Sequence, residues 1–132
     1  MRLAVVGSRT FTDRNTVFVI LNEYYKVFGD ELSFVSGGCP RGPDRYAEEF
    51  AELYDIPILI LPANWNEHGR AAGFIRNSDI VNECEEVVAF WDRKSNGTRD
   101  TINEARKQNK EVIIIDTDLT FTEKFVKLLS SK

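Results

Sequence analysis

Short apolar runs recur along the chain and are separated by longer segments of mixed polarity. The runs are rich in β-branched residues and show no strict alternation of apolar and polar positions, which is typical of strands covered on both faces. They predict five buried strands, over residues 3–6, 33–36, 57–61, 87–91 and 112–115.

The segments between these strands carry apolar residues three and four positions apart, which is the period of an amphipathic helix. They predict helices over residues 14–28, 46–54, 71–84 and 98–109, and a last helix that carries Phe121, Phe125, Leu128 and Leu129. Thr120 and Glu123 have the spacing of a capping box, which indicates where that last helix begins. The acidic residues Glu83, Glu85 and Glu86 are expected to face solvent.

Strands that alternate with helices predict parallel βαβ units with right-handed crossovers. We therefore expect an α/β fold: a single Rossmann-like three-layer sandwich over residues 1–132, with a five-stranded parallel sheet in the order 3-2-1-4-5. In such sheets ligands bind beyond the carboxyl ends of the strands, where the strand order reverses. The loops that follow the strands are therefore the place to look for function.

Net charge, cysteine number and the length of the apolar runs limit the class of ligand and the cellular location that we expect. The 132 residues include 17 Lys and Arg against 21 Asp and Glu, a net charge of −4. Proteins that bind nucleic acid usually carry a basic excess, so we expect no nucleic acid as the main ligand. Cys39 and Cys84 are too few for a disulfide framework. No apolar run approaches the roughly 18 residues that span a membrane or resembles a signal peptide, so we expect a cytoplasmic protein without membrane contact.

The loops after the first two strands contain glycine and arginine. Gly7-Ser8-Arg9-Thr10 follows the first strand and is either a capped turn or a ligand loop. Residues 36–45 contain three glycines and two prolines and open a helix, where freed backbone amides form an anion site. In this loop the Arg41 guanidinium would add a positive charge and paired N–H donors, and Asp44 would cap the helix or hold a ribose hydroxyl.

The loops after the third and fourth strands add further polar groups. Arg76 and Asn77 lie on or beside the core-facing side of the helix over 71–84, so they need buried partners, either ligand oxygens or neighbouring loops. Trp65 is interpreted as a core residue slightly ahead of a stacking platform for a base. Gly97 and Thr98 open another helix and form a second candidate anion site.

Four segments in this order carry a resemblance. Gly7-Ser8-Arg9, the Gly-Gly-Cys-Pro-Arg-Gly-Pro-Asp stretch at 37–44, residues 62–77 and Gly97-Thr98 resemble the YspA/cpYpsA-related branch of the SLOG superfamily. This Rossmann-like group contains the cytokinin-activating LOG enzymes and the DprA proteins. The resemblance implies a pocket for a nucleotide or nucleotide derivative at the strand ends, in a protein that binds, senses or processes it, often beside phage and defence genes.

We favour binding over catalysis. LOG-type hydrolases carry Gly-Gly-x-Gly-Thr-x-x-Glu, and Thr101 stands where that glutamate would be. The alternative is a nucleotide N-glycosidase or phosphoribohydrolase, which needs a carboxylate beside the sugar; the candidates are Asp44, Asp92, Asp100 and Glu104. We expect no cofactor and, with His68 as the single histidine, no metal.

Two further predictions concern assembly and the site. The aromatic residues Phe18, Tyr24, Tyr25 and Phe28 exceed what one core face requires, which suggests a homo-oligomer. The predicted ligand-binding residues are Gly7, Ser8, Arg9, Thr10, Gly37, Gly38, Arg41, Gly42, Asp44, Trp65, Arg76, Asn77, Trp91, Ser95, Gly97, Thr98 and Arg99.

Overall fold

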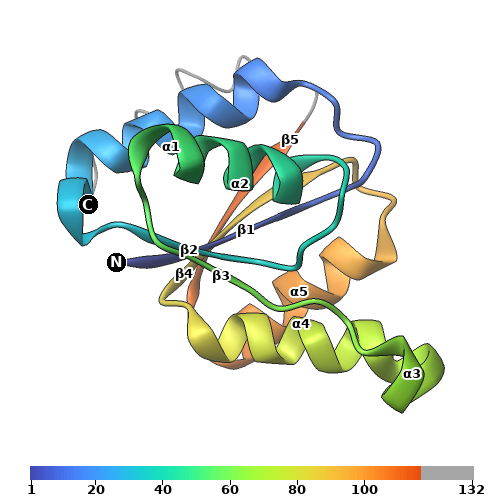
Figure 1. Ribbon diagram of the computed structural model, residues 1–132. Coiled ribbons are helices and arrows are strands. Elements are labelled where there is room, and N and C mark those ends of the chain that lie inside the picture. Colours follow the sequence, from blue (N-terminus) through green and yellow to red (C-terminus); the bar gives the residue numbers. More distant parts are fainter. Residues whose placement is uncertain (117–132) are drawn as a thin grey trace.

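Five parallel strands form one sheet in the computed structural model, which describes residues 1–116 (Figure 1). The strands are β1 (Arg2–Gly7), β2 (Ser33–Ser36), β3 (Ile58–Ile60), β4 (Glu86–Trp91) and β5 (Glu111–Asp116). Their order is β3-β2-β1-β4-β5, and every neighbouring pair is parallel. The predicted α/β class and strand order are confirmed.

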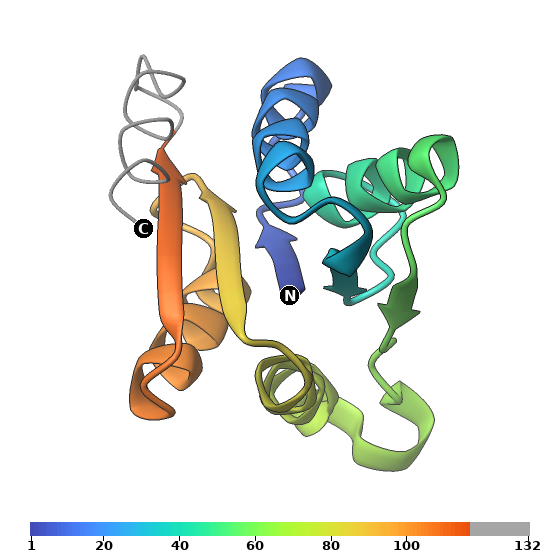
Figure 2. The ribbon, with the colours of Figure 1, turned by 90° about the vertical axis from the view of Figure 1, so that its left-hand side faces the viewer.

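Helices cover both faces of this sheet. They are α1 (Arg14–Phe28), α2 (Pro43–Tyr54), α3 (Trp65–His68), α4 (Ala72–Glu83) and α5 (Asn96–Lys107). Figures 1 and 2 show α1 and α2 on one face and α4 and α5 on the other, which makes three layers. The short helix α3 and the 3-10 turn Gly69–Ala71 after it were not predicted. The predicted last helix, with its capping box, lies outside the described residues.

The core divides into two clusters, one on each face of the sheet. Successive residues of β1 point to opposite faces, so Val5 packs with the α1 and α2 side while Ala4 and Val6 pack with the α4 and α5 side. All six residues of β4 are buried, because this strand lies inside the sheet and is covered twice. The fully apolar runs thus reflect burial on both faces.

The aromatic residues of α1 pack inside the chain. Tyr24 is fully buried and stacks on Phe28, with ring centroids 6.3 Å apart. Phe18 makes an edge-on contact with Phe50 of α2 at 5.3 Å. This internal packing accounts for the aromatic excess that suggested a homo-oligomer, which stays a prediction.

Glu86 differs from its expected position in solvent. It is 2% exposed at the start of β4, and its carboxylate accepts a hydrogen bond from the Tyr24 hydroxyl. The expectation was wrong because the acidic run spans the end of α4 and the first residue of a buried strand.

Within residues 1–116, no helix has both the length and the apolar character needed to cross a bilayer.

The strand order reverses beside β1. The chain runs outward from β1 through β2 to β3, then crosses back to β4 on the other side of β1. The loops after β1 and β4 therefore leave the same edge of the sheet in opposite directions, which opens a crevice between them. The site described next lies at this edge.

Candidate binding site at the strand ends

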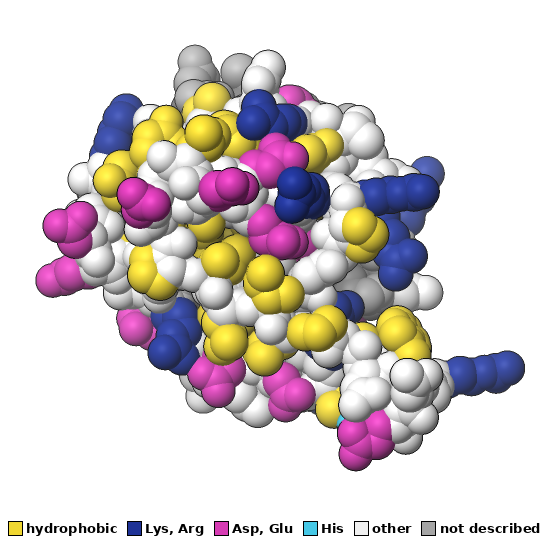
Figure 3. Space-filling view, in the orientation of Figure 1, with side chains coloured by type: hydrophobic (Ala, Val, Ile, Leu, Met, Phe, Trp, Pro, Cys, Tyr) yellow, Lys and Arg dark blue, Asp and Glu magenta, His cyan; other side chains and the backbone are white. Residues whose placement is uncertain are grey.

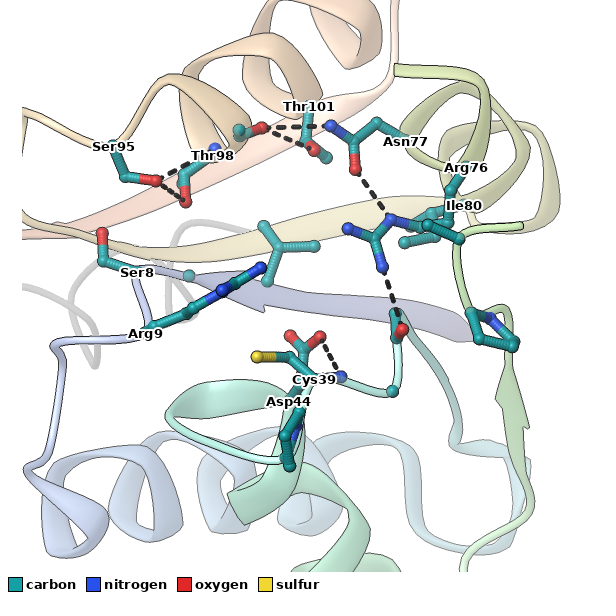
Figure 4. A pocket seen from close by; sticks show the side chains of 18 of the residues that line it. Ser8, Arg9, Cys39, Asp44, Arg76, Asn77, Ile80, Ser95, Thr98 and Thr101 are labelled. Carbon is teal, nitrogen blue, oxygen red and sulfur yellow. Dashed lines mark hydrogen bonds between the residues drawn. The ribbon is translucent and has the colours of Figure 1, made fainter. Parts of the chain in front are cut away.

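A cavity of about 750 Å3 lies beyond the carboxyl ends of β1, β2 and β4 (Figure 4). Its walls come from the loops after these strands, the segment from Pro62 to Trp65 after β3, the first turn of α5, and Arg76, Asn77 and Ile80 of α4. This volume is within the usual range of small-molecule sites, about 300–1,000 Å3. The site predicted at the switch point therefore coincides with a real cavity.

The loop after β1 forms the first wall. Ser8 is 2% exposed, its amide donates to the Phe90 carbonyl at 3.0 Å, and its hydroxyl accepts from the Asp92 amide at 3.3 Å. These bonds hold the loop against β4. The exposed Arg9 extends from the end of β1 toward the middle of the cavity (Figure 4), and it forms no ion pair with residues 1–116. Its guanidinium is therefore available to an anion.

The loop after β4 and the start of α5 form the second wall. Ser95 caps α5: its hydroxyl accepts from the Thr98 amide at 3.5 Å and from the Thr98 hydroxyl at 3.3 Å. The amides of Asn96 and Gly97 precede the first intrahelical bond, as at every helix start. No acidic residue lies in the first turn of α5. This helix start thus presents donors and a positive dipole end to the cavity.

Asp92 shapes that loop. Its Oδ1 accepts from the Lys94 and Ser95 amides, both at 2.8 Å, and its Oδ2 accepts from the Thr10 hydroxyl at 3.2 Å. These donors lower the pKa of Asp92 to about 2, because they favour the charged carboxylate. Asp92 therefore serves as the anchor of a turn, a role that the sequence reading did not predict.

The glycine-rich loop between β2 and α2 forms the third wall. Gly38 and Gly42 both have φ of +73°, a conformation that L side chains rarely adopt. Asp44, in the first turn of α2, is 8% exposed, and its Oδ2 accepts from the Cys39 amide at 3.1 Å. Burial raises the pKa of Asp44 to about 6, against the opposing effects of the Cys39 amide and the Arg76 guanidinium.

Two residues of α4 tie the walls together. Arg76 donates through Nη1 to the Gly37 carbonyl at 2.9 Å and through Nε to Asn77 Oδ1 at 3.1 Å. Asn77 in turn donates to the Gly97 carbonyl at 3.2 Å and to Asp100 Oδ2 at 3.1 Å. The chain of bonds, drawn in Figure 4, joins the loop after β2 to α5 through α4. Both side chains thus act as scaffold for the cavity.

The cavity brings most of the predicted site residues together. It is lined by Gly7, Ser8, Arg9, Thr10, Gly37, Gly38, Asp44, Trp65, Arg76, Asn77, Ser95, Gly97 and Thr98. Trp65 is 57% exposed at its rim, so the interpretation as a core residue was wrong. α3 carries Trp65 out from the end of β3 to the edge of the cavity, beside Gly73 of α4.

Four predicted residues do not line the cavity. Arg41 is exposed, and Gly42 directly precedes α2 and lies against Ser8 and Arg9 of the loop after β1. Trp91 is 9% exposed and donates to the Ser95 carbonyl at 3.1 Å. Arg99 lies over the Trp91 ring, 5.4 Å from its centre. Trp91 and Arg99 thus stabilise the loop after β4 from outside the cavity.

The predicted ligand-binding set leaves out several lining residues, of which Asp92 was named from the sequence only as a candidate catalytic carboxylate: Val6, Cys39, Pro40, Pro62, Ala63, Ile80, Asp92 and Thr101. Position alone would have found two of them, because Pro62 and Ala63 directly follow a strand. Thr101 lies one helical turn beyond Gly97 and donates to its carbonyl at 3.2 Å. In residues 1–116, no three His, Cys, Asp or Glu side chains gather as a metal-binding group would.

Comparison with known proteins identifies the family. The model of the YspA, cpYpsA-related SLOG family matches residues 1–68, which include β1, the glycine-rich loop and Trp65. The chain belongs to this family. The resemblance found in the sequence motifs is thereby confirmed. The Gene 61 protein of Mycobacterium phage D29 is 34% identical to this SLOG protein over 118 residues, 85% of the chain and 94% of the relative. A phage relative fits the expected association with phage genes.

Solved structures share the fold of this SLOG protein at low identity. DNA processing protein A from Streptococcus pneumoniae matches with a TM-score of 0.73 at 17% identity, over 98% of this chain. The Helicobacter pylori protein matches with 0.68 at 19%, over 86%. The chain spans only 56% and 64% of these two. The molybdenum cofactor binding protein from Rippkaea orientalis matches with 0.69 at 20%, over 98% of this chain and 84% of its own.

One of these neighbours corrects the prediction about partners. The Helicobacter pylori protein binds single-stranded DNA, so excluding nucleic acid as the main ligand from net charge alone was wrong. A net charge averages over the whole surface, whereas binding depends on local charge. In Figure 3 a group of Lys and Arg side chains gathers on the side where the strands end. The exposed basic residues near these strand ends are Arg9, Arg41, Arg70, Arg93, Lys94 and Arg99.

Proposed function

We propose that the cavity at the strand ends of this SLOG protein binds a nucleotide or a nucleotide-derived small molecule. The observation that carries the proposal is that Arg9 and the start of α5 line the same cavity. A guanidinium, helix amides and the Thr98 hydroxyl are groups that bind phosphate oxygens. The rim residue Trp65 offers an exposed ring face on which a base can stack.

The two helix starts at the cavity differ in what they hold. The start of α2 already carries the Asp44 carboxylate, so its positive dipole end has an anion from the protein itself. The first turn of α5 has no acidic residue, and the Asp92 carboxylate that precedes it is already bonded to the Lys94 and Ser95 amides and the Thr10 hydroxyl. We therefore expect the phosphate at the start of α5 and another part of the ligand beside Asp44.

The alternative of N-glycoside hydrolysis now depends on one carboxylate. Asp100 and Glu104 do not line the cavity, and Asp100 accepts from Asn77. Asp92 accepts two hydrogen bonds within its own turn, from the Lys94 and Ser95 amides, and a third from the Thr10 hydroxyl. Asp44 and Asp92 are the two candidates that line the cavity, and Asp44 accepts the fewer hydrogen bonds. Binding without hydrolysis remains our proposal, and base release from nucleoside monophosphates, abolished by D44N, would replace it with the enzymatic one.

Calorimetry tests the binding. A panel of nucleoside mono- and diphosphates and ADP-ribose is titrated into the full chain, and Arg9→Ala is compared with Arg41→Ala. Losing a charge-assisted bond weakens binding about tenfold or more, so we expect that loss in Arg9→Ala alone. Arg41 is the matched control, since it is exposed and does not line the cavity. Equal losses in both variants, or no binding by any ligand at millimolar concentration, would contradict the proposal.

Single-stranded DNA is a second candidate ligand. The exposed basic residues near the strand ends and the exposed ring of Trp65 favour it. Channels for single strands combine cationic side chains with aromatic stacking. A 12-nucleotide oligo(dT) would then bind more tightly than dTMP, with an affinity that falls steeply with salt. Equal affinity for the two, with a shallow salt dependence, would leave the cavity as a site for single nucleotides.

A further inference from the structure

A buried carboxylate on the α2 wall of the cavity indicates which part of the ligand it receives. In Figure 4 the Asp44 carboxylate points from the start of α2 into the cavity, and Thr98 and Arg76 lie across the cavity from it. We propose that Asp44 accepts the 2′,3′-diol of a ribose, so that the site selects ribonucleotides over deoxyribonucleotides. The inference rests on the proposed function, because it assigns the sugar of a ligand whose phosphate binds at α5.

The chemistry of a carboxylate limits what can lie beside it. An ionised carboxylate only accepts hydrogen bonds, and its two oxygens offer about four lone-pair positions. The Cys39 amide uses one position on Oδ2. A group that occupies the remaining space must donate, which excludes phosphate oxygens and favours hydroxyl or amino groups. A vicinal diol supplies two donors on adjacent carbons, which matches the two oxygens of one carboxylate.

The order of groups along the cavity distinguishes a sugar from a base. Arg9 and the start of α5 lie on one side of Asp44, while Trp65 and Pro62 belong to the wall that follows β3. A nucleotide has its phosphate at one end, its base at the other and its sugar between them. With phosphate at α5 and the base against Trp65, the group that faces Asp44 is the sugar.

Holding the Cys39 amide does not by itself require a carboxylate at this position. The neighbouring Gly38 amide is held at 3.2 Å by the Ser36 hydroxyl, which shows that a neutral acceptor is sufficient in this loop. Burying a charge nine-tenths of the way costs free energy unless donors compensate it. A neutral Asn would hold the Cys39 amide without that cost. The diol of a bound ribose gives the charge a function that Asn would perform less well.

The test removes the hydroxyls from the ligand and the charge from the protein in turn. AMP, 2′-deoxy-AMP and 3′-deoxy-AMP are titrated into the full chain and into D44N. Hydrogen bonds to a charged group contribute enough that we expect each deoxy ligand to bind the wild type about 10-fold more weakly. In D44N the three affinities should agree within about twofold, because the charged acceptor is gone. Inorganic pyrophosphate, which has no sugar, should bind D44N at least as tightly as the wild type.

Each outcome separates this inference from the proposed function. If AMP and its deoxy forms bind the wild type equally, the diol does not reach Asp44 and only this inference fails. If no nucleotide binds, the proposed function itself fails. If D44N keeps the wild-type preference for ribose, another residue makes the selection and the inference is overturned. The ligand series in the wild type stands without any variant, so a folding defect in D44N would not remove the test.

Discussion

Arg76 and Gly37 touch across the cavity floor: the guanidinium of Arg76 donates to the Gly37 carbonyl at 2.9 Å. A Cβ placed on Gly37 would stand 2.5 Å from Arg76 Nη1 and 3.0 Å from Asp44 Oδ2. The absence of a side chain at this glycine therefore makes room for the bond between α4 and the loop after β2. The contact concerns packing, because the φ of Gly37 is not positive.

The first prediction is that Gly37→Ala displaces the Arg76 side chain and breaks this bond. The loss of a partly buried hydrogen bond to a charged group lowers the free energy of unfolding by about 1.5–3 kcal/mol. Urea denaturation of Gly37→Ala, Arg76→Ala and the double variant measures it. Because both changes remove the same contact, the double variant should be little less stable than Arg76→Ala. Additive losses would show that Gly37 is constrained by something other than Arg76.

The second prediction concerns Asn77, which bonds to Gly97, Asp100 and Arg76 and is 6% exposed. Asn77→Ala leaves buried polar groups without partners, so stability should fall by about 2–3 kcal/mol. Asn82→Ala is the control on the same helix, where the side chain of the exposed Asn82 accepts a hydrogen bond from the partly exposed Gln108 side chain, and its cost should stay below about 1 kcal/mol. A loss of nucleotide affinity in Asn77→Ala without a loss of stability would instead indicate direct contact with the ligand.

The third prediction is a pH dependence that comes from Asp44. Its pKa is about 6 in the folded chain, above the ordinary value of 3.8, so the folded state holds the proton more tightly than the unfolded state. Stability contributed by this group is therefore present at low pH and is lost as pH rises from about 4 to about 6. Arg76 of α4 and the Cys39 and Gly37 amides favour the charge, while burial and Glu48 of α2 oppose it.

The comparison of wild type with Asp44→Asn isolates this effect from other titrating groups. At pH 7 the variant should be more stable by at most about 3 kcal/mol, the free energy of a shift of roughly two pKa units. At pH 4 the two proteins should have similar stability. Urea denaturation across this range measures the difference. A variant that is less stable than the wild type at pH 7 would mean that the charged carboxylate stabilises the loop.

The sheet could be predicted from sequence because burial on both faces leaves a direct mark on strand composition, as in the fully buried β4. α1 was predicted with its observed ends for a similar reason, since its apolar positions repeat over four turns. α3 was not, because four residues from Trp65 to His68 are too few to show a period. For the site, the sequence could assign arginines to the loops after the strands, but it could not show where their side chains point. Arg9 enters the cavity, whereas Arg99 lies over Trp91.

The last prediction uses a glycine that borders open space. A Cβ on Gly97 would meet no described atom within 4 Å, and Gly97 both lines the cavity and belongs to the first turn of α5. Gly97→Ala should therefore raise stability by up to about 1 kcal/mol, because alanine favours the helix. Its methyl group would lie against the amides where we place the phosphate, so nucleotide affinity should fall at least tenfold, a loss of about 1.4 kcal/mol.

Gly73→Ala is the matched control for this variant. Gly73 also lies in a helix, does not line the cavity, and an added Cβ would make an ordinary contact with Trp65 at 3.6 Å. Both variants should gain stability in urea denaturation, and only Gly97→Ala should lose affinity in calorimetry. A phosphate bound elsewhere would leave the affinity of Gly97→Ala unchanged. Because the variant is expected to fold better than the wild type, a loss of binding in it cannot be attributed to unfolding.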